Sequence, residues 1–276
     1  MGRMSAPKQR RLGRTGLMVT ELGLGAMDTP TSPEGAATVA RAVERGITFI
    51  DTAREYAGSE FLLGQHIRYH VHGGLQIGTK SFSRTSNGIQ RDVDRSLSVL
   101  GVERIELYQL HDVTTPEAWE RVMLGDDGAL AGLKVAQYRG LIGHIGISSH
   151  SLEILKKAIT CGEFETVMLE YSAFFPQSAS LIDLAAEHDV GVIVMRPLGG
   201  SGRTSVIRGR LQDGSAGILT PANLLRYVLS HPHVSVAIPG ARYPSRIEEN
   251  VATVSAYEPM DAAEARALEQ AAARLY

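Results

Sequence analysis

The chain has 276 residues, of which 43% are hydrophobic and 21% charged, and its formal net charge is −2. This balance is typical of a globular protein and excludes the strongly basic character of many nucleic-acid-binding proteins. Cys161 is the only cysteine, so an intramolecular disulfide, a cysteine-based zinc site and an iron–sulfur cluster cannot form within one chain. The apolar runs are too short to cross a membrane, and the N-terminus lacks the apolar stretch of a secretory signal. We therefore expect a cytoplasmic protein without a nucleic-acid or membrane partner.

Short apolar runs alternate with longer amphipathic stretches along the chain. We predict strands at Leu22–Leu24, Thr48–Ile50, Leu75–Gly78, Ile105–Leu110, His144–Ile147, Thr166–Leu169, Gly191–Met195 and Ser235–Ile238. Their nearly continuous hydrophobicity is typical of strands that are buried on both faces of a parallel sheet. We predict helices at Pro33–Arg45, Glu60–Tyr69, Ile89–Leu100, Pro116–Arg139, Leu152–Ala158, Ser180–His188, Ala222–Ser230 and Arg246–Ala256. Eight strand–helix pairs favour an α/β protein with a TIM (β/α)8 barrel, and the pattern alone leaves an open doubly wound sheet as the alternative.

Three segments lie outside these repeats. Residues 1–20 are predicted to form a solvated tail followed by a hairpin, Arg11–Thr20, across the barrel floor. Ser201–Gly217 is rich in Gly, Ser and Arg and is predicted to be a mobile loop, and residues 261–276 are predicted to form a C-terminal helix. The basic residues of the tail are Arg3, Lys8, Arg10 and Arg11. No composition shift marks a second domain, so residues 1–276 are predicted to form one barrel domain.

Ionisable residues follow three consecutive predicted strands. Asp51, Lys80 and His111 occupy equivalent positions, and the carboxyl ends of barrel strands form the active site in enzymes of this fold. One such residue alone would be interpreted as a solvated strand end, but three of different chemistry favour a site. Tyr56 follows Asp51 by five residues, and its phenol has an ordinary pKa of about 10. We expect Lys80, held by Asp51, to lower that pKa, and His111 to orient a substrate carbonyl.

The segment Gly46–Tyr56, with its Asp-Thr-Ala and the tyrosine that follows, resembles the signature of the aldo-keto reductase family. The resemblance continues, in order, through Gly58-Ser59-Glu60, Leu63-Gly64, Gly78-Thr79-Lys80, Tyr108–His111, Ile145–Ser148, Ile238–Ala241 and Arg246 with Glu249 and Asn250. It implies a catalytic tetrad of Asp51, Tyr56, Lys80 and His111. It further implies hydride transfer from NADPH to an aldehyde or ketone, with Tyr56 as general acid. The dinucleotide would lie extended across the barrel mouth, which agrees with the lack of a GxGxxG turn between a strand and a helix.

Two arginines near the start of the last barrel helix suit phosphate binding. Arg242 and Arg246 combine guanidinium donors with the positive end of a helix. The resemblance implies that Arg246 and Asn250 contact the adenosine end of the cofactor, with Glu249 nearby. Our hypothesis is that Arg242 and Arg246 face the 2′-phosphate and favour NADP over NAD.

The nicotinamide end departs from the best-known family pattern. Ser148-Ser149 stands where the family has Ser-Asn, Met168 where it often has Gln, and Met195 where it often has a stacking Tyr. These changes resemble a divergent branch, some members of which carry an iron–sulfur extension that this chain lacks. The remaining predicted cofactor-binding residues are Arg196, Pro197, Leu198 and Gly240.

Other polar and aromatic residues are weaker candidates for a functional site. The pairs His70/His72 and His231/His233 lack further convergent ligands, so no metal site is predicted. His150 follows the fifth strand and lies near the expected mouth. The aromatic residues after the sixth strand form either an apolar substrate wall or ordinary packing; they are Tyr171, Phe174 and Phe175.

Three alternatives to carbonyl reduction remain open at the level of the sequence. The same residues serve oxidation of an alcohol, the reverse reaction. A regulatory nucleotide-binding protein, in the manner of potassium-channel β-subunits, is the first rival, and a barrel enzyme with a Schiff base on Lys80 is the second. The partner is expected to be a small carbonyl compound or alcohol, and the chain a monomer or small homo-oligomer.

Overall fold

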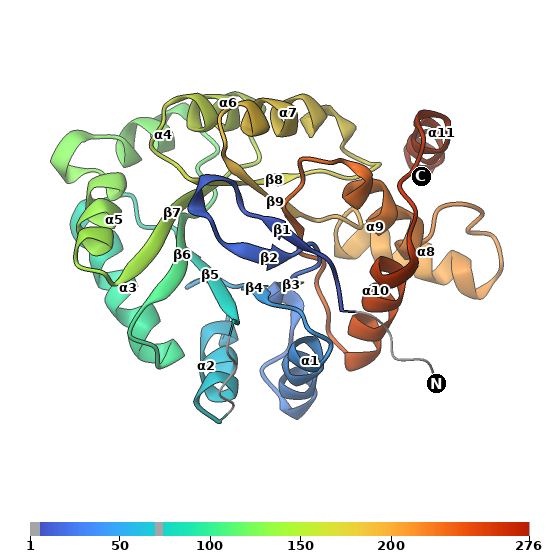
Figure 1. The fold of residues 1–276 in the computed structure, drawn as a ribbon, viewed down its shortest axis with the longest axis horizontal. Helices are drawn as coiled ribbons and strands as arrows, with labels where there is room; N and C mark the ends of the chain where they lie inside the picture. The colour runs from blue at the N-terminus through green and yellow to red at the C-terminus, as the bar shows by residue number, and fades with distance from the viewer. Residues whose placement is uncertain (1–5, 70–73, 276) are drawn as a thin grey trace.

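A parallel sheet that closes on itself forms the centre of the molecule. A computed structural model describes residues 6–69 and 74–275, and all statements below concern these residues. The strands, in sheet order, are β3 (Leu24–Gly25), β4 (Phe49–Asp51), β5 (Gln76–Ser81), β6 (Ile105–Leu110), β7 (Ile142–Ser148), β8 (Thr166–Glu170), β9 (Gly191–Met195) and β10 (Val236–Ala237). Parallel bridges from Leu22 to Ala237 and from Gly25 to Gly240 join the first strand to the last. The predicted TIM barrel is confirmed, and the open sheet is excluded (Figure 1).

The pairing register decides which side chains point into the barrel. Phe49 and Leu107 belong to an interior apolar cluster, whereas their neighbours Ile50 and Tyr108 pack outward against the helices. Because side chains alternate along a strand, the residue two positions further on shares the inward face. Towards the carboxyl ends, the next inward-facing residues are Asp51 on β4 and Gln109 on β6. Lys80 on β5 pairs with Gln109 and so faces inward as well. The interior therefore changes from apolar to polar as it approaches the mouth.

An antiparallel hairpin covers the floor of the barrel, as predicted. It consists of β1 (Gln9–Arg11) and β2 (Met18–Thr20), and lies across the ring of strands in Figure 1. Leu12 and Val19 from this hairpin are fully buried in the interior cluster. The apolar plug leaves the carboxyl ends of the strands as the open end of the barrel.

The predicted solvated tail is wrong for Arg10. Its guanidinium donates to Glu21 Oε2, to the carbonyl oxygens of Leu229 and Val234, and to the hydroxyl of Tyr257. The buried Glu21 carboxylate attracts the guanidinium, and the strand pairing of β1 holds it in place. Arg3 lies outside the described residues.

Helices surround the sheet and begin at polar caps. They are α1 (Pro33–Glu44), α2 (Ser59–Tyr69), α3 (Ser86–Leu100), α4 (Pro116–Val122), α5 (Ala129–Tyr138), α6 (Leu152–Thr160), α7 (Ala179–Glu187), α8 (Ser201–Gln212), α9 (Pro221–Ser230), α10 (Pro244–Ala256) and α11 (Ala262–Ala273). Ser32, Thr85 and Thr220 accept backbone N–H groups at the starts of α1, α3 and α9. α11 confirms the predicted C-terminal helix.

Two helix predictions need correction. The predicted helix Pro116–Arg139 is divided into α4 and α5, because Gly125 adopts a positive φ of 43° in the turn between them. The predicted mobile loop Ser201–Gly217 contains a three-turn helix, α8. None of the described helices combines the length and the apolar character that a membrane span requires.

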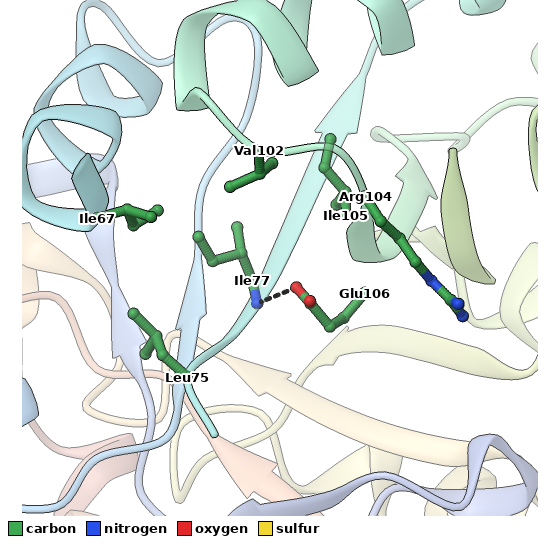
Figure 2. Close-up of a pocket in the computed structure, with 7 residues that line it drawn as sticks. All are labelled: Ile67, Leu75, Ile77, Val102, Arg104, Ile105 and Glu106. Carbon is green, nitrogen blue, oxygen red and sulfur yellow. Dashed lines mark hydrogen bonds between the residues drawn. The ribbon is translucent and has the colours of Figure 1, made fainter. Parts of the chain in front are cut away.

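A small cavity of about 80 Å³ lies at the amino ends of β5 and β6. Figure 2 shows Ile67, Leu75 and Val102 around it, with the Ile77 N–H donating to Glu106 Oε2 at 3.1 Å. This cavity is small and lies away from the polar strand ends. It is a packing gap between α2, α3 and the sheet.

Candidate active site

A cavity of about 760 Å³ opens at the carboxyl ends of the strands. All four predicted catalytic residues line it: Asp51, Tyr56, Lys80 and His111. Ten of the predicted cofactor-binding residues also line it: Ser148, Met168, Met195, Arg196, Pro197, Leu198, Gly240, Arg242, Arg246 and Asn250. Ser149 and Glu249 lie outside the lining. The sequence therefore predicted about half of the residues that line this one cavity, and they come from strands far apart in the chain.

A buried ion pair forms the base of this cavity. Lys80 Nζ donates to Asp51 Oδ1 and, at 2.8 Å, to the carbonyl oxygen of Thr52. Gln109 Nε2 donates to the other oxygen of Asp51 at 3.3 Å. The side chains of Lys80 and Asp51 are 1% and 3% exposed. Burial lowers the pKa of Lys80 and raises that of Asp51, and the attraction between the two charges opposes both shifts.

Tyr56 lies directly above this pair. Lys80 Nζ is 4.7 Å from the centroid of the phenol ring, and the His111 ring meets it edge-on at 5.6 Å. Burial, followed by the negative charges of Asp51 and Glu55, raises the pKa of Tyr56 above its ordinary value. The expected lowering of this pKa is therefore wrong for the chain alone, because burial and the negative charges of Asp51 and Glu55 disfavour the phenolate. At neutral pH the phenol keeps its proton and is able to donate it.

His111 is held by residues that the sequence argument did not identify. Its Nδ1 is 2.9 Å from Glu55 Oε2, and its ring stacks on Phe82 at 4.2 Å with an interplanar angle of 8°. Arg84 donates to the His111 carbonyl oxygen at 2.7 Å. Their positions in the sequence gave one indication that these residues lie near the site, because Glu55 adjoins Tyr56 and Phe82 follows Lys80 by two residues.

The two serines after β7 have different surroundings. Ser148 lines the cavity, and its Oγ accepts the Asp112 N–H at 2.9 Å. Ser149 is fully buried, and its Oγ accepts the Ser151 N–H at the start of α6. Met168 belongs to the interior cluster and also forms part of the cavity surface. Ser148 is therefore better placed than Ser149 to contact a ligand.

Positive groups gather where α8 and α10 meet the cavity. Arg242, Arg246 and Arg208 all line it, and Arg208 belongs to the helix that was predicted as a loop. The N-cap residues of α8 and α10, Gly200 and Tyr243, make no side-chain cap hydrogen bond, so the positive ends of both helices are free to face a ligand. Glu249 pairs with both Arg246 and Arg208 and so links α10 to α8. Arginines and free helix N-termini together suit an anionic ligand with more than one phosphate.

Backbone conformation is unusual where two strands end at this mouth. Asp112, after β6, and Arg196, after β9, both adopt a φ of 51°. This left-handed region is unfavourable for residues other than glycine, above all for a long side chain. Arg196 donates to Glu170 Oε2 at 3.3 Å, so its conformation places a guanidinium beside the site.

The remaining candidates do not form a second site. Among residues 6–69 and 74–275, no cluster of three or more His, Cys, Asp and Glu residues suits a metal ion. His70 and His72 lie outside the described residues. Tyr171 packs against Tyr227 and His231 and does not line the cavity, so its place is in the core. His150 does line the cavity, as expected.

Comparisons with known proteins find relatives that are aldo-keto reductases or other oxidoreductases. The model of the Aldo/keto reductase family matches residues 21–214. An uncharacterized oxidoreductase of Bacillus subtilis is 24% identical in a match that covers 90% of this chain and 92% of that protein. The holo form of an aldo-keto reductase from Bacillus halodurans has a TM-score of 0.80 and 23% identity, and the match covers 96% of each chain. An aldo-keto reductase from Klebsiella pneumoniae, solved in complex with NADPH, has a TM-score of 0.76 and 21% identity over 96% of this chain and 95% of that one.

Proposed function

The chain belongs to the aldo/keto reductase family, and from that premise we propose that it is an NADP(H)-dependent oxidoreductase that reduces an aldehyde or ketone. The observation that carries this proposal is the convergence of Asp51, Tyr56, Lys80 and His111 on one cavity. The same cavity has arginines and two free helix N-termini along its wall. A proton donor and a phosphate-binding surface thus share one space.

The cavity fits a dinucleotide in size and charge. Its volume of about 760 Å³ lies within the range of about 300–1,000 Å³ that is usual for ligand sites. Arg208, Arg242 and Arg246 would hold the phosphates, and Ser148 the carboxamide of the nicotinamide. The NADPH complex of the Klebsiella pneumoniae protein, which has the same fold, supports this choice of cofactor. When bound, the reduced nicotinamide supplies the hydride.

Tyr56 donates the proton that the carbonyl oxygen needs. Its phenol is protonated at neutral pH, and Lys80 Nζ stabilises the phenolate that remains after donation. Asp51 keeps Lys80 charged and in place through a buried hydrogen bond. His111 lines the same cavity next to Tyr56, so that both are placed to hydrogen-bond one carbonyl oxygen.

The environment of Lys80 disfavours a Schiff-base enzyme. The amine is 1% exposed and donates hydrogen bonds to Asp51 and Thr52. A nucleophilic amine needs a free lone pair and access to a carbonyl carbon. Borohydride trapping of a carbonyl compound on Lys80 is the result that would revive this rival.

The Arg246→Ala variant tests the cofactor preference. Loss of a charged hydrogen bond to the 2′-phosphate costs about 1.5–3 kcal/mol, so the Kd for NADPH is expected to rise about 10- to 150-fold. The Kd for NADH, which lacks that phosphate, is expected to change little. Fluorescence titration with both nucleotides measures the two constants. Arg266→Ala, an exposed arginine on α11, is the matched control. An equal loss for NADH and NADPH would contradict the assignment of Arg246.

The proposed activity itself is tested by titrating the chain with NADPH and then screening small aldehydes and ketones. Saturable NADPH binding together with carbonyl-dependent NADPH oxidation would support the reductase. Binding without turnover on any carbonyl compound would favour the regulatory rival, and the lack of NADPH binding would contradict the proposal.

A further inference from the structure

Asp112 lines the cavity although its position after β6 predicts the opposite direction. Side chains alternate along this strand, so that Leu107 belongs to the interior cluster and Leu110 packs outward against the helices. His111 continues the inward series, and the next residue would point outward if the extended backbone continued. A φ of 51° ends the extended backbone at Asp112, which lines the cavity beside His111. The left-handed conformation therefore brings two successive residues of this segment to the mouth.

The segment that carries Asp112 is fixed by its neighbours, whereas one oxygen of the carboxylate is not. The N–H groups of Asp112 and Val113 donate to Ser148, to Oγ and to the carbonyl oxygen, each at 2.9 Å. Thr114 Oγ1 donates to Oδ1 of the Asp112 carboxylate. No residue in the described part of the chain donates a hydrogen bond to Oδ2, and Asp112 is exposed. The carboxylate is therefore held at Oδ1 and has Oδ2 available for a ligand.

The charged residues that line the cavity are sorted by wall. The carboxylates lie at or after the carboxyl ends of β3, β4 and β6, and the guanidinium groups lie after β9 and β10. The carboxylate residues are Asp28, Asp51, Glu55 and Asp112, and the arginines are Arg196, Arg208, Arg242 and Arg246. In the proposed function the cofactor phosphates occupy the arginine wall, which leaves the carboxylate wall, where Tyr56 lies, for the carbonyl substrate.

Three of these carboxylates have a partner among the described residues, so Asp112 Oδ2 is the acceptor that remains for a substrate. The partners are Lys80 for Asp51, Arg242 for Asp28, and His111 with the Phe82 N–H for Glu55. The Arg84 guanidinium donates to the Asp112 carbonyl oxygen at 3.0 Å and adds a positive charge beside it. A second cation would be repelled by Arg84 and an anion by the carboxylate. A neutral hydroxyl group is able to donate to Oδ2 without either repulsion.

We propose that Asp112 determines the substrate class, which is a neutral aldehyde or ketone with a hydroxyl group on the carbon next to the carbonyl. The carbonyl oxygen lies at Tyr56, and the neighbouring hydroxyl group donates to Asp112 Oδ2. Asp112 binds the substrate and takes no part in the transfer of the hydride or the proton. This inference deepens the proposed function and rests on it.

Three aldehydes with one carbon skeleton test this preference in the wild-type chain. Propanal, lactaldehyde and alaninal differ at the carbon next to the aldehyde, which carries only hydrogen, a hydroxyl group or an ammonium group. A hydrogen bond to a charged acceptor is expected to make kcat/KM for lactaldehyde about 10- to 150-fold higher than that for propanal. Alaninal is expected to be a poorer substrate than lactaldehyde. Steady-state oxidation of NADPH measures the three values.

Variants of Asp112 separate the hydrogen bond from the intrinsic reactivity of the aldehydes. Asp112→Gly removes the acceptor, and glycine adopts the left-handed backbone without strain. The ratio of kcat/KM for lactaldehyde to that for propanal is expected to fall at least about tenfold in this variant. Asp112→Asn also tolerates the backbone and keeps a neutral acceptor, so it should lose less of the ratio. Asp189→Gly is the matched control, because Asp189 has a φ of 53° and pairs with Arg11 at the barrel floor. It should leave the ratio unchanged.

The outcomes distinguish this inference from the proposed function. A ratio in Asp112→Gly equal to that of the wild type, or a wild-type preference for alaninal over lactaldehyde, would overturn the role of Asp112 while the reductase stands. If none of the three aldehydes is reduced, the proposed function fails. Nitrogen-15 NMR titration of the full chain with glycerol then still decides whether Asp112 holds a hydroxyl group. A saturable shift of the Val113 amide signal that Asp112→Gly abolishes would support that role, and the lack of such a shift in the wild type would contradict it.

Discussion

Replacement of Tyr56 with phenylalanine is expected to lower kcat for carbonyl reduction by about 10²- to 10⁴-fold, the usual contribution of a positioned general acid. The variant removes one hydroxyl and keeps the ring that packs beside Lys80 and His111. The Kd for NADPH is therefore expected to stay within about a factor of two, because the proposed phosphate contacts lie on α8 and α10. Stopped-flow or steady-state kinetics and nucleotide titration measure the two effects separately.

The chain contains a matched control for this change. Tyr138 on α5 is 94% exposed, so Tyr138→Phe makes the same substitution without contact to the cavity. It should leave kcat and the Kd unchanged. Residual activity of Tyr56→Phe above about a tenth of the wild-type value would show that another group donates the proton. Simultaneous loss of NADPH binding would indicate a misplaced loop and not a missing acid.

The Lys80→Met variant is expected to be the most destabilised single substitution at the site. It removes the ammonium and leaves the Asp51 carboxylate 3% exposed, with Gln109 as its remaining side-chain donor. An uncompensated buried charge costs about 3–5 kcal/mol of unfolding free energy. In a chain of this size, that cost corresponds to a Tm lower by about 6–20 °C. Turnover is expected to fall as well, because the phenolate of Tyr56 loses its stabilising cation.

This destabilisation has a defined pH dependence. Without Lys80, burial of Asp51 is opposed only by the weaker effects of His111 and Gln109, and it raises the pKa of the folded carboxyl above its unfolded value of about 3.9. The folded state then binds the proton more tightly, so its stability falls as the pH rises from about 4 through the folded pKa. Thermal unfolding at pH 5 and pH 8 should show the larger deficit at pH 8.

Two variants test the physical cause of this loss. The double variant Asp51→Leu/Lys80→Met removes both charges and should recover part of the lost stability. Lys134→Met breaks an exposed ion pair with Glu163 and should cost at most about 1 kcal/mol. A deficit in Lys80→Met no larger than that of Lys134→Met would contradict the buried-pair account.

The barrel and its catalytic end could be predicted because both depend on local patterns. Continuous apolar runs identified the strands, and the polar residues at their carboxyl ends identified the mouth. β5 extends to Ser81, beyond its predicted end at Gly78, so Lys80 lies within the strand. The alternation of side chains still directs it inward, because Lys80 pairs with Gln109. An error of three residues in a boundary therefore did not misplace the site.

The features that were missed depend on contacts between distant segments. α8 contains two glycines, and among its described residues only Ile207 is buried, so its sequence has no helical apolar face. Its anchors are Arg208 to Glu249 and Arg210 to the carbonyl oxygen of Leu275. The Glu55–His111 contact likewise joins residues 56 positions apart. No local pattern reports such pairs, and the burial of Ser149 and Tyr171 depends on packing that only the folded chain defines.

The left-handed backbone at Asp112 and Arg196 implies a trade-off between durability and turnover. Such conformations cost about 1–3 kcal/mol each, and the rest of the barrel must supply that free energy. Glycine relieves the strain at either position, yet at position 196 it also removes the guanidinium beside the site. Selection for heat resistance alone would therefore favour glycine at position 196, and selection for activity would retain arginine. Directed evolution of this enzyme towards a higher melting temperature should therefore select stabilising substitutions far from the two strand ends. Substitutions at the strand ends that raise the melting temperature should lower the activity.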